Sequence, residues 1–264
     1  MAITTLPGTD GADTSLVGTS GVDTFEIKDY AKDVFVGAQQ SADTATITGT
    51  VGDFTVRMGS GADTLTFSGG LENSFVNGNG DADTITFKGA VVGSTAEGGQ
   101  GNDTIIAEKT IATSVFQGRK GNDTLTVTGT TTSSTVNGNE DDDNITLTGL
   151  VTSSSVYGGK ADDTVTASEV TKSLIAGNDG DDDLNLNGNL TDATVNGNDG
   201  TDDIDIANGA AISNATVYGG AGRDTITYTG AGDIYISGDA ANDTLELTGA
   251  GDNTIKGGLG QDAI

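Results

Sequence analysis

The 264-residue sequence contains no cysteine, no histidine and no tryptophan, and its one proline is Pro7. Without cysteine no disulfide can form. Without cysteine and histidine, the chain has neither thiolate nor imidazole metal ligands, and it lacks the Ser-His-Asp and Cys-His arrangements of nucleophilic enzymes. Any metal site must therefore be built from oxygen ligands.

Basic residues are also scarce, since 11 Lys and Arg stand against 39 Asp and Glu, for a formal net charge of -28. This excess makes nucleic acid an unfavourable partner, because binding to phosphates depends on Lys and Arg. It also destabilises a compact chain that lacks counter-ions, because the charges repel one another. We expect most of the excess acidic residues to lie on the solvated surface.

Long apolar stretches are missing as well. Only 34% of the residues are hydrophobic and 5% are aromatic, and no run approaches the 18 apolar residues of a membrane-spanning helix. The first residues, "MAITTLPGTDGADT", lack the basic and apolar regions of a cleaved signal peptide. We expect no membrane insertion, and we expect that any export uses another signal.

What the chain has in excess is glycine, at 42 residues, and a repeated pattern. An aspartate stands before each short alternating segment, first at steps of 20 residues and later at steps of 19 to 22. The 13 aspartates are Asp23, Asp43, Asp63, Asp83, Asp103, Asp123, Asp143, Asp163, Asp182, Asp202, Asp224, Asp243 and Asp262. A fixed period in this range predicts a solenoid.

Each repeat unit contains two segments that alternate in the way of half-buried strands. Residues 121–140, "GNDTLTVTGTTTSSTVNGNE", show "DTLTV", a Gly/Thr break and "SSTV" before the next turn. Thr, Val and Ile dominate these segments, and such β-branched residues favour strands. We therefore predict an all-β, right-handed parallel β-roll or β-solenoid of about 13 coils of about 20 residues, with two short strands per coil and almost no helix.

The alternation also assigns side chains to faces, because successive residues of a strand point to opposite sides. The first strand turns inward an apolar column that includes Phe25/Ile27, Leu65/Phe67, Ile85/Phe87, Leu125/Val127, Ile145/Leu147, Leu184/Leu186, Ile226/Tyr228 and Leu245/Leu247. The second strand supplies Val36, Val56, Val76, Ala96, Phe116, Val136, Val156, Ile175, Val195, Val217, Ile236 and Ile255, with small residues such as Ser94 and Ser114 two places earlier. At about 4.8 Å per coil, the rod would be about 60 Å long.

The repeated aspartate has the same parity as the inward apolar residues, so Asp123 is expected to point inward with Leu125 and Val127. A lone buried carboxylate is costly. Stacked about 5 Å apart, neighbouring carboxylates would repel by about 3 kcal/mol at an effective dielectric constant near 20. The column therefore needs cations or protons. The alternative is that each aspartate only shapes its turn through its own backbone.

Among cations, Ca²⁺ suits such a column best, because it accepts six to eight oxygen ligands in flexible geometry, whereas Mg²⁺ keeps its waters and demands an octahedron. Glycine and asparagine in turns such as "GGQGN" tolerate left-handed backbone conformations. Such a turn can direct carbonyl groups toward a cation that the following aspartate neutralises.

The stretches "GGQGNDTII", "GGAGRDTIT" and "GGLGQDAI" resemble the nonapeptide G-G-x-G-x-D-x-U-x of the RTX family, and the resemblance covers nearly the whole chain. It implies a parallel β-roll that binds several Ca²⁺ ions between its turns, export by a type I system and folding in extracellular calcium. The best matches are at Asp103, Asp123, Asp224 and Asp262. The candidate metal ligands are Asp63, Gly80, Asp81, Asp83, Gly99, Gly101, Asp103, Gly121, Asp123, Asp141, Asp143, Asp163, Gly180, Asp182, Gly200, Asp202, Gly220, Gly222, Asp224, Asp243, Gly258, Gly260 and Asp262.

The chain also departs from this family pattern. Family coils have 18 residues with a loop on both sides, whereas here the period is 20 and the second turn lacks the Gly-Asp pattern, so we expect one column of sites along one edge. Several loops replace a glycine, as Asp81 and Asp141 do, and the loops at Asp43 and Asp243 match poorly. We divide the chain into residues 1–22, an irregular start whose "GTDGADT" and "GTSGVDT" lie 10 residues apart, and residues 23–264, the RTX-like repeats without a C-terminal cap.

Pairs of threonines occupy outward positions on the first strand, namely Thr44/Thr46, Thr64/Thr66, Thr84/Thr86, Thr124/Thr126, Thr164/Thr166 and Thr225/Thr227. This array resembles the T-x-T face of ice-binding solenoids. The simpler interpretation is β-propensity with cross-strand threonine pairing. Other residues interrupt the array at Glu26, Ile106, Asp183, Asp203, Asp205 and Glu246.

An enzyme is disfavoured, because carboxylate pairs such as Asp141 and Asp143 are spread along an edge, whereas a glycosidase needs two at a set distance in a cleft. We expect a non-enzymatic, calcium-binding structural component of the cell surface, in an S-layer, matrix or filament, whose fold and assembly depend on Ca²⁺. Its expected partners are other copies of itself and a cell-surface polysaccharide. The alternatives are an ice-binding or adhesive solenoid and the RTX module of a larger secreted enzyme.

Overall fold

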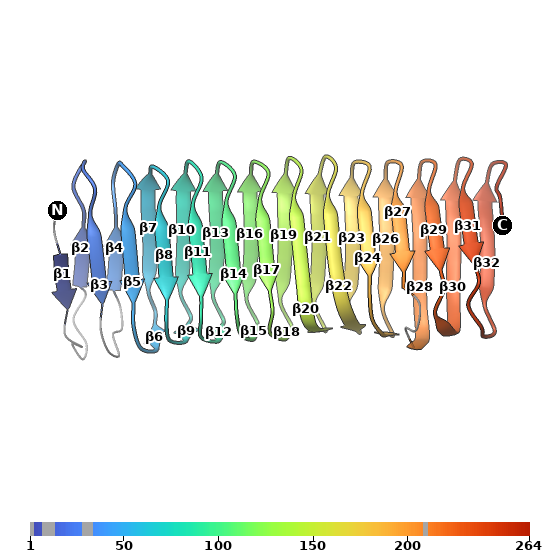
Figure 1. The fold of residues 1–264 in the computed structure, drawn as a ribbon, viewed down its shortest axis with the longest axis horizontal. Helices are drawn as coiled ribbons and strands as arrows, with labels where there is room; N and C mark the ends of the chain where they lie inside the picture. Colours follow the sequence, from blue (N-terminus) through green and yellow to red (C-terminus); the bar gives the residue numbers. More distant parts are fainter. Residues whose placement is uncertain (1–2, 7–13, 28–33, 208–210) are drawn as a thin grey trace.

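The computed structural model describes residues 3–6, 14–27, 34–207 and 211–264, with no side-chain description for 3–6 and 14. In this part of the chain strand follows strand without a helix, and neighbouring coils pair in parallel. The result is a β-solenoid of about 12 turns of ~20 residues, seen in Figure 1 as a straight rod with the two termini at opposite ends. The predicted all-β parallel solenoid is confirmed.

Two layers of strands form the walls of the rod. The first wall contains β2(Thr14–Val17), β4(Val34–Gly37), β7(Thr55–Ser60), β10(Phe75–Gly80), β13(Thr95–Gln100), β16(Val115–Lys120), β19(Thr135–Glu140), β21(Ser155–Lys160), β23(Leu174–Asp179), β26(Thr194–Asp199) and β32(Thr254–Leu259). The second contains β1(Ile3–Leu6), β3(Thr24–Ile27), β5(Thr44–Ile47), β8(Thr64–Phe67), β11(Thr84–Phe87), β14(Thr104–Ala107), β17(Thr124–Val127), β24(Asp183–Leu186), β27(Asp203–Ile206), β29(Thr225–Tyr228) and β31(Thr244–Leu247). The two walls run in opposite directions (Figure 1).

A third, short strand lies in the turn opposite the glycine-rich one, where the sequence had predicted only two strands per coil. It is separate in β6(Val51–Gly52), β9(Leu71–Glu72), β12(Val91–Val92), β15(Ile111–Ala112), β18(Thr131–Thr132) and β25(Leu190–Thr191). Elsewhere it continues into a wall strand, in β20(Asn144–Thr152), β22(Thr164–Thr171), β28(Ala211–Ala221) and β30(Ala231–Ala240). Its first residue faces inward, as Ile111 does, so this turn also contributes to the core.

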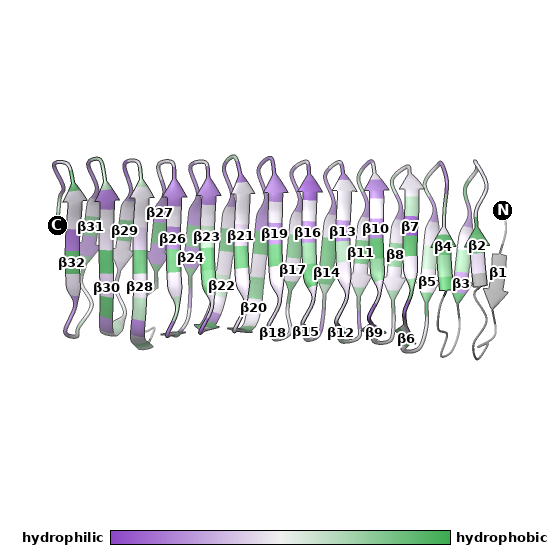
Figure 2. Ribbon diagram, turned by 180° about the vertical axis from the view of Figure 1, so that it is seen from behind, coloured by the Kyte–Doolittle hydropathy of each residue, from purple (hydrophilic) through white to green (hydrophobic). Residues whose placement is uncertain are grey.

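Strict register from coil to coil holds the predicted faces in place. Leu125 pairs with Ile105 and Ile145 on its two neighbours, and all three side chains are buried. The inward residues of both walls form one continuous apolar cluster along the described part of the rod. Apolar positions alternate with polar ones along each strand, as the colours in Figure 2 show. The predicted core columns are confirmed, with Leu247 and Ile255 of the last coil only partly covered.

The glycine-rich turn is tighter than the motif suggested. Strand β13 continues through "TAEGGQ" to Gln100, so only residues 101–103 separate it from β14. Gly99 and Gly101 have positive φ values of 128° and 108°, which glycine adopts without strain. Near the start of the chain, the predicted second loop "GTDGADT" falls on residues 8–14, of which 8–13 lie outside the described residues.

Candidate functional site

The repeated aspartates line the inside of the rod at the glycine-rich turn. From Asp23 to Asp243 each side chain is at most 3% exposed, while Asp262 in the last coil is half-buried. The predicted inward orientation is confirmed. We call these residues the aspartate column: Asp23, Asp43, Asp63, Asp83, Asp103, Asp123, Asp143, Asp163, Asp182, Asp202, Asp224, Asp243 and Asp262.

One oxygen of each carboxyl group links two coils. The backbone N–H of Asp83 donates to Oδ1 of Asp103 at 2.7 Å, and the N–H of Asp103 donates to Oδ1 of Asp123 at 2.7 Å. The same bond joins each consecutive pair of the column, with distances of 2.6 to 3.1 Å. The column is thus a ladder of carboxyl groups in which every rung after Asp23 accepts from the preceding coil.

The other oxygen has no hydrogen-bond partner although it is fully buried. These atoms are Oδ2 of Asp43, Asp63, Asp83, Asp103, Asp123, Asp143, Asp163, Asp182, Asp202, Asp224 and Asp243. An orphaned buried acceptor costs about 1–3 kcal/mol. A proton on Oδ2 would turn the acceptor into a donor. Both Asp83 Oδ2 and the carbonyl oxygen of Gly98 border the space above Gly78.

A column of inward glycines makes room for these carboxyl groups. A Cβ added to Gly98 would lie less than 3.0 Å from Oδ2 of Asp103, five residues later. The same holds for Gly18, Gly78, Gly118, Gly138, Gly158, Gly177, Gly197, Gly219, Gly238 and Gly257, whereas the coils of Asp43 and Asp63 have Ala38 and Met58 there. The sequence analysis had placed Gly98 in the cation-binding turn, and the missed signal is a glycine that recurs five residues before the aspartate.

Burial raises the pKa of nearly the whole column. Desolvation is the largest cause, the backbone hydrogen bond opposes it, and in most of the column neighbouring carboxylates raise the pKa further. The pKa is raised to about 8 for Asp83, Asp143 and Asp182, to about 7 for Asp123, Asp163 and Asp224, and to about 6 for Asp63, Asp103 and Asp202. The pKa values of Asp43 and Asp243 are also raised. The ladder is therefore built to hold protons near neutral pH.

The acidic side chains alone do not form a calcium site. Among the residues that the structure describes, no group of three or more Asp or Glu side chains converges, so backbone carbonyl groups would have to complete the shell of a calcium ion. Most inward carboxyl groups already use Oδ1 for the neighbouring coil and have Oδ2 enclosed against a glycine. The predicted ligands Asp81 and Asp141 are instead exposed, and each accepts from a backbone N–H, of Gly61 and Gly121 respectively.

The predicted glycine ligands lie in or next to the turns. Gly99, Gly101, Gly121, Gly180, Gly200, Gly220, Gly222, Gly258 and Gly260 have positive φ, and Gly80 does not. Several of their turns are held by hydrogen bonds to the next coil, as when Gly101 N–H donates to Lys120 O at 2.8 Å. The glycines thus allow close stacking of the turns, and the calcium sites stay a prediction.

A second ladder runs through the opposite turn and contains serine. The N–H of Ser94 donates to Oγ of Ser114 at 3.2 Å, and Oγ of Ser114 donates to the carbonyl of Ala112 at 2.8 Å. We call this the serine ladder: Ser74, Ser94, Ser114, Ser134, Ser154 and Ser173. The sequence analysis had treated these serines only as small residues. Each hydroxyl both donates and accepts, so this ladder has no orphaned oxygen.

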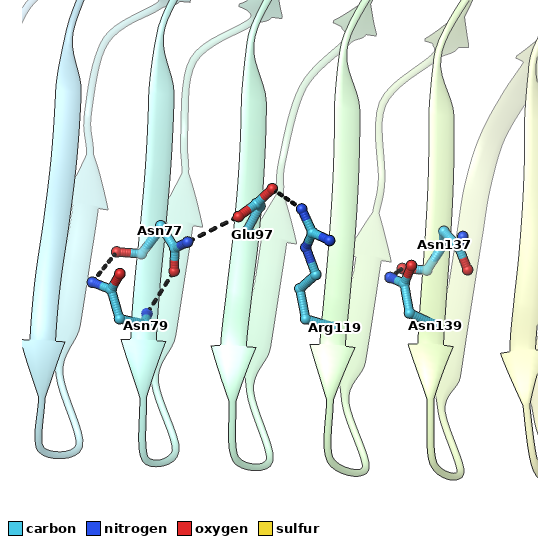
Figure 3. Close-up of polar contacts among 6 residues, drawn as sticks. All are labelled: Asn77, Asn79, Glu97, Arg119, Asn137 and Asn139. Carbon is cyan, nitrogen blue, oxygen red and sulfur yellow. Dashed lines mark hydrogen bonds and ion pairs between the residues drawn. The ribbon is translucent and has the colours of Figure 1, made fainter.

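A shallow trough crosses the outer face of the first wall, over β10, β13, β16, β19, β21 and β23. Two adjoining hollows of about 450 and 460 Å³ share Asn139 and Glu140. Figure 3 shows the polar side chains along part of it: Asn77 donates to Glu97 at 2.8 Å and Arg119 pairs with Glu97. Glu97 is only 8% exposed. Sequence reasoning missed these residues. The available signal is a polar residue six places before the aspartate at Asn77 and Glu97, whereas Arg119 stands four places before its aspartate.

The outward threonines of the second wall stack in register as predicted. Thr44, Thr64, Thr84, Thr104 and Thr124 pair in succession. Ile106 interrupts the second row, and further on Asp183, Asp203 and Asp205 take the threonine positions. Between β5 and β22 the two threonine rows are broken only at Ile106 and Asn144.

Comparisons with protein-family models, with curated proteins and with solved structures gave no match. The resemblance to the RTX family thus stays an expectation based on its motifs. Within the described residues there is no helix that is long and apolar enough to cross a membrane.

Proposed function

We propose that this chain is a non-enzymatic structural protein of the cell exterior, a rigid rod that assembles end to end with other copies of itself. The observation that carries the proposal is the ladder of coil-to-coil bonds, in which every coil offers its neighbour the same groups. The outermost coil of one copy can therefore receive a coil of another copy in the same way. Such head-to-tail contacts extend into a fibre because they need not close.

The last described coil illustrates the kind of surface that a further coil, of this chain or of another copy, would cover. Ile255 and Leu247 are only partly buried, since they pack against the core from one side only. Strand β32 pairs with β30, and within the described residues it has no partner on its other side. An unpaired strand edge with an apolar column beside it favours addition of a further strand.

The same carboxyl ladder would control assembly through protons. A new coil must accept or present a buried Asp–N–H bond, and an ionised carboxylate resists that burial. Assembly should therefore be favoured at low pH, where a carboxyl group that becomes buried between two copies is protonated. Calcium dependence, which the sequence motifs predicted, is the competing means of neutralising the column.

Electron microscopy and light scattering at pH 5 and pH 8, each with EGTA or with millimolar calcium, test the proposal. We expect rods that are multiples of one molecule in length at pH 5, with or without calcium. Ile255→Lys should keep them single, because it places a charge on the apolar end face. Lys256→Glu, on the same strand, serves as the matched control and should still assemble. Single rods under all four conditions would overturn the proposal.

A second candidate function is favoured by the threonine rows of β5 through β22, which are in register as ice-binding solenoids require. The rows present Thr44/Thr46, Thr64/Thr66, Thr84/Thr86 and Thr164/Thr166 on one face. A thermal-hysteresis assay decides this candidate. Faceted ice and a freezing gap would support it, and smooth spherical ice growth would remove it.

A further inference from the structure

We propose that the trough on the first wall binds a neutral polysaccharide that runs along the rod and crosses its strands. This role goes beyond assembly, because it concerns the outer face of the wall and leaves the ends of the rod unoccupied.

The floor of the trough arises from the bend near the end of each wall strand. Within each of these strands one position has positive φ: Asn79, Gly99, Arg119, Asn139, Gly159 and Asn178. These residues are partners in register from β10 to β23. Where the position is Gly99 or Gly159 no side chain fills the surface, so the hollows form beside long polar side chains.

The side chains in the trough are held in place before any ligand arrives. Oδ1 of Asn77 accepts from Asn79 N–H at 2.6 Å, and its Nδ2 donates to Glu97 at 2.8 Å. Glu97 also holds the guanidinium of Arg119, as the dashed lines of Figure 3 show. Prior ordering of polar groups lowers the entropy cost of binding.

The groups that remain available suit hydroxyl ligands. Asn139 Nδ2 donates to the carbonyl of Asn137 at 3.1 Å, which leaves the second proton of this amide and its Oδ1 for a ligand, whereas Oδ1 of Asn137 is itself buried. Amides and a guanidinium together supply donors and acceptors for vicinal hydroxyl pairs. Tyr157, outward-facing and in register with Asn137, adds an aromatic side chain with an apolar body next to these amides.

The balance of charges in the trough favours a neutral ligand. The whole chain has only 11 basic residues and a net charge of -28. The trough nevertheless balances three basic side chains with three acidic ones: Arg119, Lys120 and Lys160 against Glu97, Glu140 and Asp179. A polyanion would gain nothing in such a neutral strip and would be repelled by the rest of the surface.

The shape of the trough favours a linear polymer that crosses several strands. The trough spans six neighbouring strands spaced by about 4.8 Å, so similar groups recur at about the length of one sugar ring in an extended chain. A peptide that adds to a sheet needs an unpaired edge, but the backbone under the trough is already paired on both sides. A linear polysaccharide is the ligand that fits both restrictions.

Native gels that contain a soluble polysaccharide test the proposal with the full chain. The panel is mixed-linkage β-glucan, mannan, dextran and galactan as neutral polymers, with alginate as the anionic one. We expect at least one neutral polymer to slow the protein and alginate to have no effect. No retardation by any neutral polymer, or equal retardation by alginate, would overturn the proposal.

Two variants locate the site on the trough. The double substitution E97Q/R119N keeps the net charge and so the free mobility, and asparagine already occupies the Arg119 position in neighbouring coils. It should weaken retardation at least tenfold. Asn137→Ala, with no side-chain partner lost, is the second variant if the double one fails to fold. Thr126→Asn, on the opposite wall, should bind like the parent. Equal binding by the folded trough variants and the parent would refute the site.

Discussion

The two turns of each coil supply an acceptor for a buried backbone N–H, but they do so with different side chains. Ser114 and Asp103 each accept a backbone N–H from the preceding coil with a buried side-chain oxygen. The serine hydroxyl then donates to a carbonyl two residues earlier, whereas the second carboxyl oxygen has nothing to accept from. The hydrogen bonds of the serine ladder are therefore complete at any pH, whereas the aspartate column needs a proton or a cation at its second oxygen. The stability of the serine edge should not depend on pH, and that of the aspartate edge should.

The largest expected effect is on pH dependence. Folded-state pKa values of about 6 to 8 lie above the ordinary aspartate value of 3.8, so the folded state binds more protons than the unfolded state. Stability should be full below about pH 4 and should fall as the pH rises to about 8. Urea denaturation should show a midpoint at least about 1 M higher at pH 5 than at pH 8, where 1 M corresponds to about 1–3 kcal/mol.

Salt separates this effect from the general repulsion of a chain with charge -28. Exposed charges are screened at high ionic strength, while buried ones are screened much less. The pH dependence should therefore persist in 0.5 M NaCl, about the same in size. If the pH dependence disappeared in salt, it would come from charges on the surface and not from the buried column.

The second-largest expected effect is the loss of stability when a glycine that faces the aspartate column is replaced. Gly78→Ala would place a Cβ against Oδ2 of Asp83 and the carbonyl of Gly98, and overpacking of this kind costs about 3 kcal/mol at the upper end of its range. Gly80→Ala, in the same strand, meets its nearest atom only at 3.7 Å and is the matched control. Thermal melts of the two variants should differ clearly. Equal melting temperatures would show that the column is not packed as described.

A carboxyl-to-amide exchange should stabilise the rod at alkaline pH. Asp143→Asn keeps the acceptor and supplies a permanent donor where the carboxyl group needs a proton. We expect a gain of about 1–3 kcal/mol at pH 8 and little change at pH 4, measured by urea denaturation. Asp142→Asn removes the same charge at the adjacent exposed position and should change little at either pH. A loss of stability from Asp143→Asn at pH 8 would favour a cation ligand instead.

The smallest expected effect is in the serine ladder. Ser114→Ala leaves the buried N–H of Ser94 without its acceptor, which should cost about 1 kcal/mol. Because the hydroxyl does not titrate, the loss should be equal at pH 5 and pH 8. Urea midpoints at the two pH values check this, and a strongly pH-dependent loss would break the contrast between the two edges.

Periodicity was sufficient to predict the fold, because register fixes which residues face inward. Leu125 and Asp123 share parity, and both are buried as expected. The third strand, as in β18, was missed since two residues such as Thr131 and Thr132 carry no alternation of their own. The repeat alone therefore predicts the two wall strands of each coil better than the short strand in the turn between them.

The site was harder to predict, because its chemistry depends on the direction in which each carboxyl oxygen of the aspartate column points. The sequence shows that Asp103 recurs with glycines, but not that Oδ1 bonds the preceding coil or that Gly98 lies over Oδ2. The trough depends on contacts between residues about 20 apart, such as Asn77 with Glu97. Such contacts form only when the coils stack, although polar residues do recur in the sequence at steps of 20 residues.

Circular dichroism with urea denaturation, at pH 5 and pH 8 and in EGTA or millimolar calcium, tests the central claim that protons complete the aspartate column. The account predicts a β-rich spectrum in EGTA at pH 5, a lower urea midpoint at pH 8, and little effect of calcium at pH 5. A chain that is disordered in EGTA at pH 5 and gains β-structure only when calcium is added would contradict it, and would establish the calcium-dependent folding that the motifs predicted.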